Sequence, residues 1–123
     1  MHNYQDLQVY QRSLVLAKEL VVYFKDRRPF SLSEQIVRSA ISVPSNISEG
    51  AERGSQKEFL RYLSISLGSA AELGTQLEIA SSIMTEADQN QFIQEKNAEI
   101  KEIRAMISWT HEYSFERPRL LKS

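Results

Sequence analysis

The sequence contains no cysteine and few histidines, glycines or prolines. Its 123 residues include two histidines, four glycines and three prolines. The absence of cysteine excludes a disulfide framework, a thiolate metal site and a cysteine nucleophile. So few glycines and prolines argue against a β-sandwich or barrel, because those folds need many turns.

Long apolar runs are also missing. Runs such as residues 20–24 are far shorter than the roughly 20 residues that a membrane-spanning helix needs. No apolar signal-peptide segment follows Met1. We therefore expect a cytoplasmic protein with no membrane partner.

The remaining composition suits one globular domain with a single core, since 41% of the residues are apolar and 25% are charged. The net charge of −1 is unevenly distributed along the chain. Residues 1–62 carry a net charge of +2, residues 63–116 carry −6 and residues 117–123 carry +3. A dedicated polyanion-binding domain is usually strongly basic, so only a local basic surface is expected here.

Apolar residues recur with a helical period in four segments. These segments cover about residues 5–27, 31–53, 55–83 and 86–113. The connections between them are short, and short connections place consecutive helices antiparallel. The sequence therefore predicts an all-α fold, a single antiparallel up-down-up-down four-helix bundle over residues 1–116. Residues 117–123 are expected to form a basic, frayed tail.

Local signals mark the helix ends. Residues 31–34 and 55–58 both match the capping box, in which a serine and a glutamate satisfy each other's backbone amides. Thr85 is the expected N-cap of the fourth helix. Pro44 lies inside the second segment, where the apolar period continues across it. It therefore predicts a kink near residues 40–43 and not a loop.

The apolar face differs in width between segments. The first segment has two neighbouring apolar stripes, which predicts burial against more than one helix. The first stripe is Leu7, Tyr10, Leu14, Ala17, Val21 and Phe24, and the second is Val9, Leu16, Leu20 and Tyr23. The fourth segment carries charges of alternating sign, typical of a solvent-exposed helix. These charges are Glu95, Lys96, Glu99, Lys101, Glu102 and Arg104.

Residues for catalysis are scarce. The only histidines are His2 and His111, and neither belongs to an H-E-x-x-H or Glu-x-x-His pattern. The glycines near residue 50 lack the spacing of a phosphate-binding loop. No serine has a positioned histidine as its base. The sequence therefore predicts no enzymatic activity, no cofactor and no metal.

A polar stripe follows the second segment opposite its apolar face. It consists of Arg38, Ser42, Asn46, Glu49 and Arg53. Serine and asparagine lower the helicity of a helix surface that nothing covers. We therefore expect the side chains of this stripe to contact other protein groups.

The outward positions of the third segment are unusually small, which suits close packing of another subunit. Three interpretations of these polar and small residues remain open: an oligomer interface, an intramolecular hydrogen-bond network or a solvated face. The candidate interface or network residues are Ser42, Asn46, Glu49, Ser64, Gly68, Ala71, Glu72 and Thr75.

Basic residues gather around the predicted turn between the second and third segments. Arg53, Lys57 and Arg61 are spaced by four residues, and Arg38 lies on the same side of the second segment. Such spacing can meet successive phosphates of a nucleic acid. It can equally pair with neighbouring glutamates.

Several stretches resemble the bacterial four-helix-bundle proteins encoded by 23S ribosomal RNA intervening sequences. The most specific stretch is residues 36–50, IVRSAISVPSNISEG, and residues 7–10, 58–63 and 68–73 also match the family's pattern. The resemblance covers roughly residues 4–113.

This resemblance implies a homopentameric bundle with no established catalytic activity. Relatives include the accessory variability determinant of diversity-generating retroelements, a pentameric ring that engages nucleic acid and a reverse transcriptase. The resemblance therefore implies RNA or DNA, or a protein such as a reverse transcriptase, as a partner.

These features together favour a non-enzymatic, homo-oligomeric bundle that binds RNA, another nucleic acid or a ribonucleoprotein. Arg38, Arg53, Lys57 and Arg61 are the candidate nucleic-acid-binding residues. The alternative is an oligomeric scaffold that binds protein without touching nucleic acid.

Overall fold

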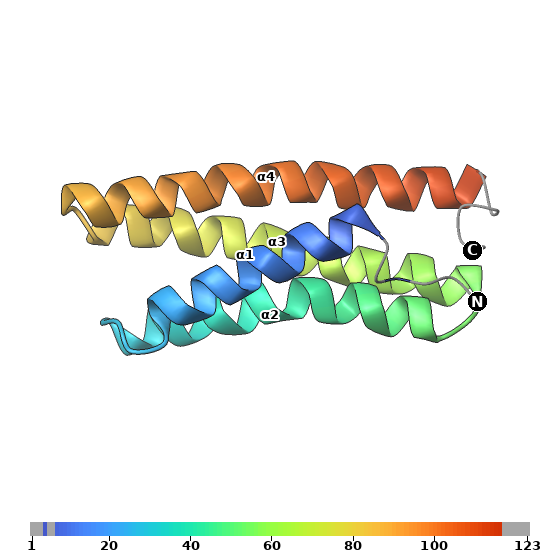
Figure 1. Cartoon of the computed structure of the whole chain (residues 1–123), viewed down its shortest axis with the longest axis horizontal. Coiled ribbons are helices and arrows are strands. Elements are labelled where there is room, and N and C mark those ends of the chain that lie inside the picture. Colours follow the sequence, from blue (N-terminus) through green and yellow to red (C-terminus); the bar gives the residue numbers. More distant parts are fainter. Residues whose placement is uncertain (1–3, 5–6, 117–123) are drawn as a thin grey trace.

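The computed structural model describes residue 4 and residues 7–116 of the chain. It contains four helices: α1 (Gln8–Phe24), α2 (Phe30–Glu52), α3 (Gln56–Ile83) and α4 (Ala87–Glu116). Consecutive helices run in opposite directions along one long bundle (Figure 1). The predicted all-α, up-down-up-down topology is therefore confirmed. The tail expected at residues 117–123, like residues 5–6 of the first predicted helix, lies outside the described residues.

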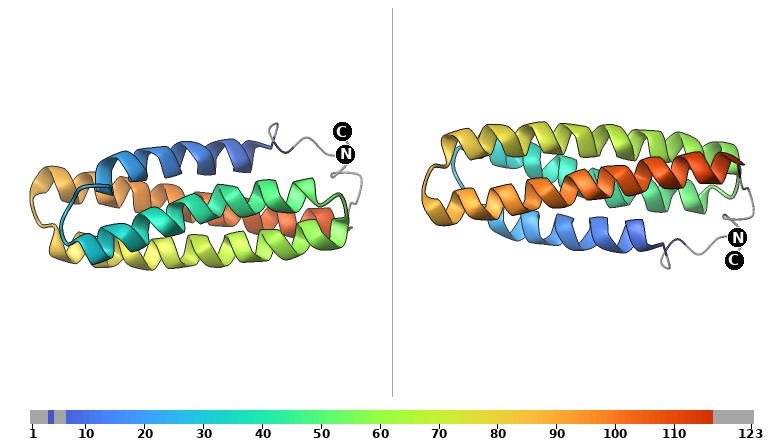
Figure 2. Two further views of the ribbon diagram at one scale, coloured as in Figure 1. Left: turned by 90° about the horizontal axis from the view of Figure 1, so that it is seen from below. Right: turned by 90° about the horizontal axis from the view of Figure 1, so that it is seen from above.

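The four helices do not contribute equally to the bundle. α2 packs closely against α3, α3 packs against α4, and α1 packs mainly against α2. The contact between α1 and α4 is much smaller, and α1 runs obliquely to α4 in two orthogonal views (Figures 1 and 2). One side of the bundle is thus held less tightly than the others.

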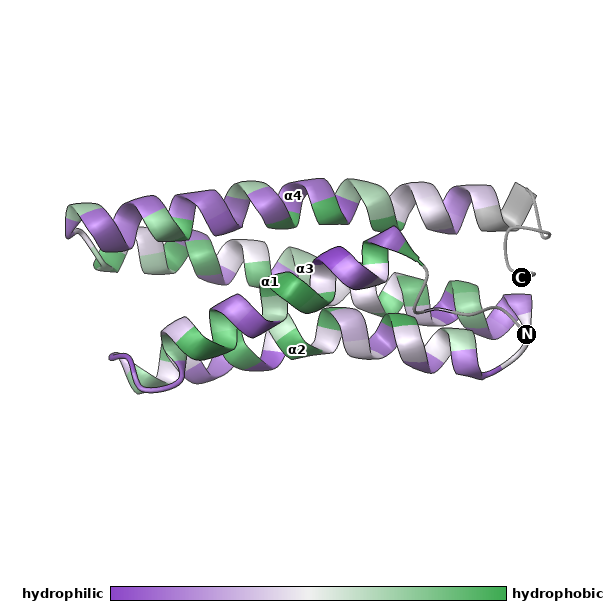
Figure 3. Ribbon diagram, viewed as in Figure 1, coloured by the Kyte–Doolittle hydropathy of each residue, from purple (hydrophilic) through white to green (hydrophobic). Residues whose placement is uncertain are grey.

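The core consists of aliphatic side chains from all four helices, with Phe24 and Phe59 near its ends. On α1 the second predicted stripe supplies much of the core, since Val9, Leu16 and Leu20 are buried. Most of the first stripe is only partly buried and faces α2. Along α4 the outer surface is hydrophilic over much of its length (Figure 3).

The helix caps are confirmed at one of three predicted positions. The Ser55 Oγ accepts a 3.2 Å hydrogen bond from the Glu58 backbone N–H at the start of α3. The capping box at residues 31–34 is wrong, because α2 begins earlier, directly after Pro29. Ser33 instead donates to the Arg27 carbonyl at 2.6 Å. The N-cap at Thr85 is also wrong, because α4 begins two residues later, at Ala87.

Pro44 lies inside a continuous α2, as the apolar period predicted. Proline removes the amide that would bond the carbonyl of residue 40. The neighbouring Val43 carbonyl accepts a 2.8 Å hydrogen bond from the buried Ser66 hydroxyl of α3. A backbone carbonyl beside the proline is therefore hydrogen-bonded to a side chain of α3.

Candidate interaction surfaces

A cluster of cations and one aromatic ring surrounds the α2–α3 turn. The chain reverses at Gly54, whose φ of +83° favours glycine. The Arg53 guanidinium lies 5.2 Å from the centre of the Tyr62 ring and donates to its hydroxyl at 2.8 Å. The Arg61 guanidinium lies 4.6 Å from the same ring. We call Arg53, Lys57, Arg61 and Tyr62 the basic cluster.

Close packing of α2 against α3 holds Tyr62 in this position. A Cβ atom added to Gly50 would lie only 2.6 Å from the Tyr62 Cβ. Glycine at residue 50 therefore lets the Tyr62 backbone approach α2, while Gly54 makes the turn that joins the two helices. The sequence pattern placed Tyr62 beside the basic residues, but only the fold shows that two guanidiniums converge on its ring.

Carboxylates balance much of the charge in the basic cluster. Arg53 pairs with Glu49 at 3.1 Å, and Arg61 makes two hydrogen bonds to Glu58 at 3.1 and 3.2 Å. The hydrogen bond from Arg61 and the surrounding cations lower the pKa of the Glu58 carboxyl. All of these pairs are at least partly exposed, so each contributes little to stability. Lys57 is exposed and has no ion pair in the described part of the chain.

Arg38 does not join the basic cluster. It precedes Arg53 by fifteen residues, which is about 22 Å along a helix. Its guanidinium lies 3.7 Å from the Glu34 carboxylate, and both side chains are largely exposed. The structure thus brings together three of the four candidate nucleic-acid-binding residues.

The polar stripe of α2 is in part an intramolecular network. The Ser42 and Ser69 hydroxyls lie 2.7 Å apart across the α2–α3 interface. The Asn46 amide donates to the Ser42 carbonyl at 2.8 Å and to its hydroxyl at 2.9 Å. Glu49 lies outside this network and is exposed. Ser69 was not singled out from the sequence, although a serine at a core-facing position of α3 is a signal for such a bond.

A polar groove of about 530 Å³ lies between α2 and α3 beside this network. Its lining includes two carboxylates, Glu34 and Glu72, and one cation, Arg38. The buried Gln76 Oε1 atom, on a residue that also lines this groove, has no hydrogen-bond partner among the described residues. The groove is lined by Ser31, Glu34, Gln35, Arg38, Ser39, Ser42, Ser69, Glu72 and Gln76.

The small residues predicted on α3 form an outward surface. Gly68 and Thr75 are exposed, and a Cβ atom added to Gly68 would meet no atom within 4 Å. Ala71 is half-buried. Ser64 is exposed and lies 3.2 Å from the His111 ring nitrogen of α4. The surface is free of contacts from its own chain around Gly68.

An apolar groove of about 350 Å³ lies between α1 and α2, and sequence reasoning did not single it out. Two side chains at its rim are strongly exposed: Val22 at 70% and Ile41 at 46%. The signal for it was the first stripe of α1, whose Tyr10, Leu14 and Val21 line the groove. The complete lining is Tyr10, Leu14, Ala17, Lys18, Val21, Val22, Ile41, Pro44, Ser45 and Ser48.

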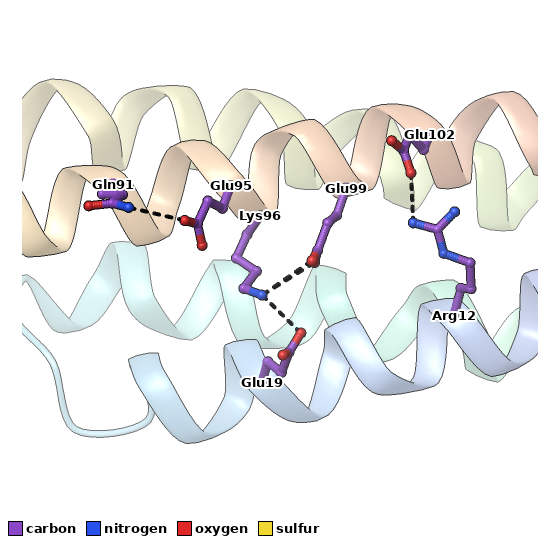
Figure 4. Close-up of polar contacts among 7 residues, drawn as sticks. All are labelled: Arg12, Glu19, Gln91, Glu95, Lys96, Glu99 and Glu102. Carbon is purple, nitrogen blue, oxygen red and sulfur yellow. Dashed lines mark hydrogen bonds and ion pairs between the residues drawn. The ribbon is translucent and has the colours of Figure 1, made fainter.

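Ion pairs join α1 to α4 where apolar contact is small (Figure 4). The Lys96 ammonium lies 3.1 Å from Glu19 and 3.3 Å from Glu99, and Arg12 pairs with Glu102 at 2.8 Å. Lys96 is buried, so its predicted place on an exposed charged face is wrong. Burial disfavours its charged form, but the hydrogen bond that Lys96 donates to Glu19 and the charges of the Glu19 and Glu99 carboxylates outweigh burial and raise the pKa of Lys96.

The described residues contain neither a candidate metal site nor a candidate membrane-spanning helix. Over residue 4 and residues 7–116, no three histidine, aspartate or glutamate side chains gather as metal ligands would. No helix in this part of the chain has an apolar stretch that would span a bilayer.

These observations define an all-α four-helix bundle with interhelical grooves and a basic cluster at one turn. Over residues 5–109 the chain matches the family described as 23S rRNA-intervening sequence protein. The protein belongs to this family, which confirms the membership that residues 36–50 indicated.

A solved structure supports the same fold. The chain is 30% identical to a protein of unknown function from the S23 ribosomal protein family of Bacteroides thetaiotaomicron, with a TM-score of 0.67. The match covers 80% of this chain and 97% of the Bacteroides chain. No curated protein matches the sequence.

Proposed function

We propose that this protein is a cytoplasmic, non-enzymatic homo-oligomer that binds RNA or another nucleic acid through its basic cluster. The observation that carries the proposal is the convergence of the Arg53 and Arg61 guanidiniums on the Tyr62 ring. Guanidinium and aromatic planes stack on unpaired bases, and cations hold phosphates. Lys57 adds an exposed cation that no carboxylate pairs with in the described part of the chain.

Repetition of the cluster in an assembly gives it useful affinity. One chain offers three cations there, and glutamates pair with two of them, so a single copy binds phosphate weakly. A homopentamer, which the family resemblance implies, presents the cluster five times. Multivalent contact then raises the apparent affinity through effective concentration.

A charge-reversal variant tests this proposal. We expect Arg53→Glu/Lys57→Glu/Arg61→Glu to lose nucleic-acid binding, because the reversed charges repel phosphates. Gel shifts with single-stranded RNA at about 50 and 200 mM salt measure this, and wild-type affinity should fall steeply between the two because bound phosphates release counterions. Helicity and oligomer mass should stay unchanged, since these side chains lie outside the core.

The matched control is Lys25→Glu/Arg28→Glu/Lys101→Glu, which reverses three exposed cations elsewhere. It makes the same charge change and should keep most of the binding. No binding by the wild type at the lower salt, or equal loss in both variants, contradicts the assignment to the basic cluster.

The second candidate function is a protein-binding scaffold without nucleic-acid contact, for instance one that recruits a reverse transcriptase. The observation that favours it is the pairing of Arg53 and Arg61 with Glu49 and Glu58, which lowers the local positive charge. A scaffold would capture a polypeptide with little dependence on salt, whereas phosphate contacts weaken steeply with salt.

A further inference from the structure

We propose that the apolar groove between α1 and α2 receives the outward face of α3 from a second copy of this chain. This inference rests on the proposed homo-oligomer and names the two surfaces that would join its subunits. The shape, the apolar character and the charge of the two surfaces all favour a second copy of the chain as the partner.

The groove is a concave apolar surface with one cation in it. Its rim exposes Val22 and Ile41 to an extent that is costly for an isolated chain. Lys18 lies on the same wall, four residues from Leu14 and four from Val22. Its ammonium has no ion pair in the part of the chain that the structure describes, so its charge is available to a partner.

The outward face of α3 carries three exposed isoleucines and one anion, which also borders the polar groove between α2 and α3. Ile65, Ile79 and Ile83 are exposed by 40%, 46% and 54%. Glu72 lies seven residues from both Ile65 and Ile79, and it has no ion pair within residues 7–116. Exposed Gly68 and Thr75 keep the helix narrow between the isoleucines. We call this surface, with its members Ile65, Gly68, Glu72, Thr75, Ile79 and Ile83, the isoleucine ridge.

The two surfaces complement each other in shape and charge. A ridge with a narrow helix centre fits into a groove, and each surface carries a single charge with apolar residues within two helical turns on either side. Placing the ridge in the groove pairs Lys18 with Glu72 of the second copy. It also removes exposed valine and isoleucine side chains from water, which is the main favourable term in association.

The groove and the ridge are different surfaces on different helices. An interface between them is therefore heterologous, and every chain that fills a groove keeps its own groove free for the next copy. Heterologous contacts close into rings when the rotation between copies allows it. This arrangement suits a ring with an odd number of subunits, which a self-complementary contact alone cannot build.

A charge swap tests the pairing. We expect Lys18→Glu and Glu72→Lys each to raise the dissociation constant of the oligomer at least tenfold, because each places like charges opposite one another. The double variant Lys18→Glu/Glu72→Lys should recover the wild-type oligomer. Light scattering coupled to size-exclusion chromatography over a concentration series measures all three, and circular dichroism confirms equal helicity. The matched controls are Lys25→Glu, at the C-terminal cap of α1, and Glu78→Lys, on α3; both positions are exposed, and both variants should leave the mass unchanged.

The outcomes separate this inference from the proposed function. A wild-type oligomer that both single variants leave intact, or that the double variant fails to restore, overturns the groove–ridge contact and leaves the proposed homo-oligomer standing. A wild-type monomer at micromolar concentration overturns both. Loss of assembly in the single variants with recovery in the double variant supports the contact.

Discussion

Individual polar side chains shape the packing between α2 and α3. Ser42 is hydrogen-bonded to both Asn46 and Ser69. The Ser66 hydroxyl donates a hydrogen bond to the Val43 carbonyl beside Pro44. Gln76 is the exception within the described chain, because its buried Oε1 atom has no donor. An unmade hydrogen bond of this kind costs about 1–3 kcal/mol, which makes Gln76 a weak point of an otherwise satisfied interface.

A substitution at Gln76 tests that cost. We expect Gln76→Met to raise the free energy of unfolding by about 1 kcal/mol, because methionine keeps the length of the side chain and removes the unpaired oxygen. Urea denaturation monitored by circular dichroism measures the change. Gln35→Met, at an exposed position of the same groove, should have no comparable effect. A lower free energy of unfolding for Gln76→Met would contradict this prediction, because it would show that the Gln76 amide stabilises the fold.

At the scale of whole helices, α1 is the least integrated. It meets α4 through a small contact, and a cavity of about 270 Å³ lies between them. The Lys96 pair with Glu19 and the Arg12 pair with Glu102 bridge the two helices where their contact is small. Since Lys96 is buried while Glu19 is partly exposed, one of these two bridges depends on the charge of a buried ammonium.

The charge of Lys96 makes the stability of the bundle depend on pH. A raised pKa in the folded state stabilises the fold at neutral pH. That contribution is complete below the unfolded pKa of about 10.4 and is lost as the pH rises through the folded value. We expect Lys96→Met to lower the free energy of unfolding by about 1–2 kcal/mol at pH 7 and by less at pH 11, because the contribution is lost as the pH rises through the folded pKa.

Urea denaturation of wild type and variant at both pH values measures this deficit. Lys101→Met, on the exposed side of the same helix, is the control and should show no deficit at either pH. A deficit of the same size at pH 7 and pH 11 would assign the effect to packing and not to the ion pairs.

At the scale of the whole molecule, the exposed apolar surfaces and the basic cluster are the features that the proposed assembly would use. The isoleucine ridge, the apolar groove and the cluster lie on surfaces that the folded chain leaves uncovered. A ring would cover the first two and repeat the third. The size of the particle in solution is therefore the property that links structure to the proposed function.

A bulky residue in the isoleucine ridge tests the assembly directly. We expect wild-type particles of about five times the 14.2 kDa chain mass, as the family resemblance implies. Gly68→Trp should dissociate them, because its ring projects from the ridge. The fold should persist, since a side chain at Gly68 meets open space in its own chain.

Analytical ultracentrifugation and circular dichroism measure mass and helicity together. Ala105→Trp, at an exposed position of α4, is the control and should keep the wild-type mass. A fully assembled Gly68→Trp variant would place the interface elsewhere.

Local sequence alone determined the helices and their order. The helical apolar period of α3, the serine cap at Ser55 and the unbroken apolar period across Pro44 all depend on the spacing of residues within one helix or its first turn. Such interactions join residues three or four positions apart, so their spacing is visible in the sequence. Short connections then left one topology for four amphipathic helices.

Only the tertiary structure decided which polar residues meet. It buried Lys96 between α1 and α4, brought Arg53 from the end of α2 onto the Tyr62 ring of α3, and joined Ser42 to Ser69 across two helices. Each outcome depends on the rotation and offset of one helix against another, which side-chain packing sets and which a helical period does not encode. The same reason explains why the groove between α1 and α2 became visible only when both helices were in place.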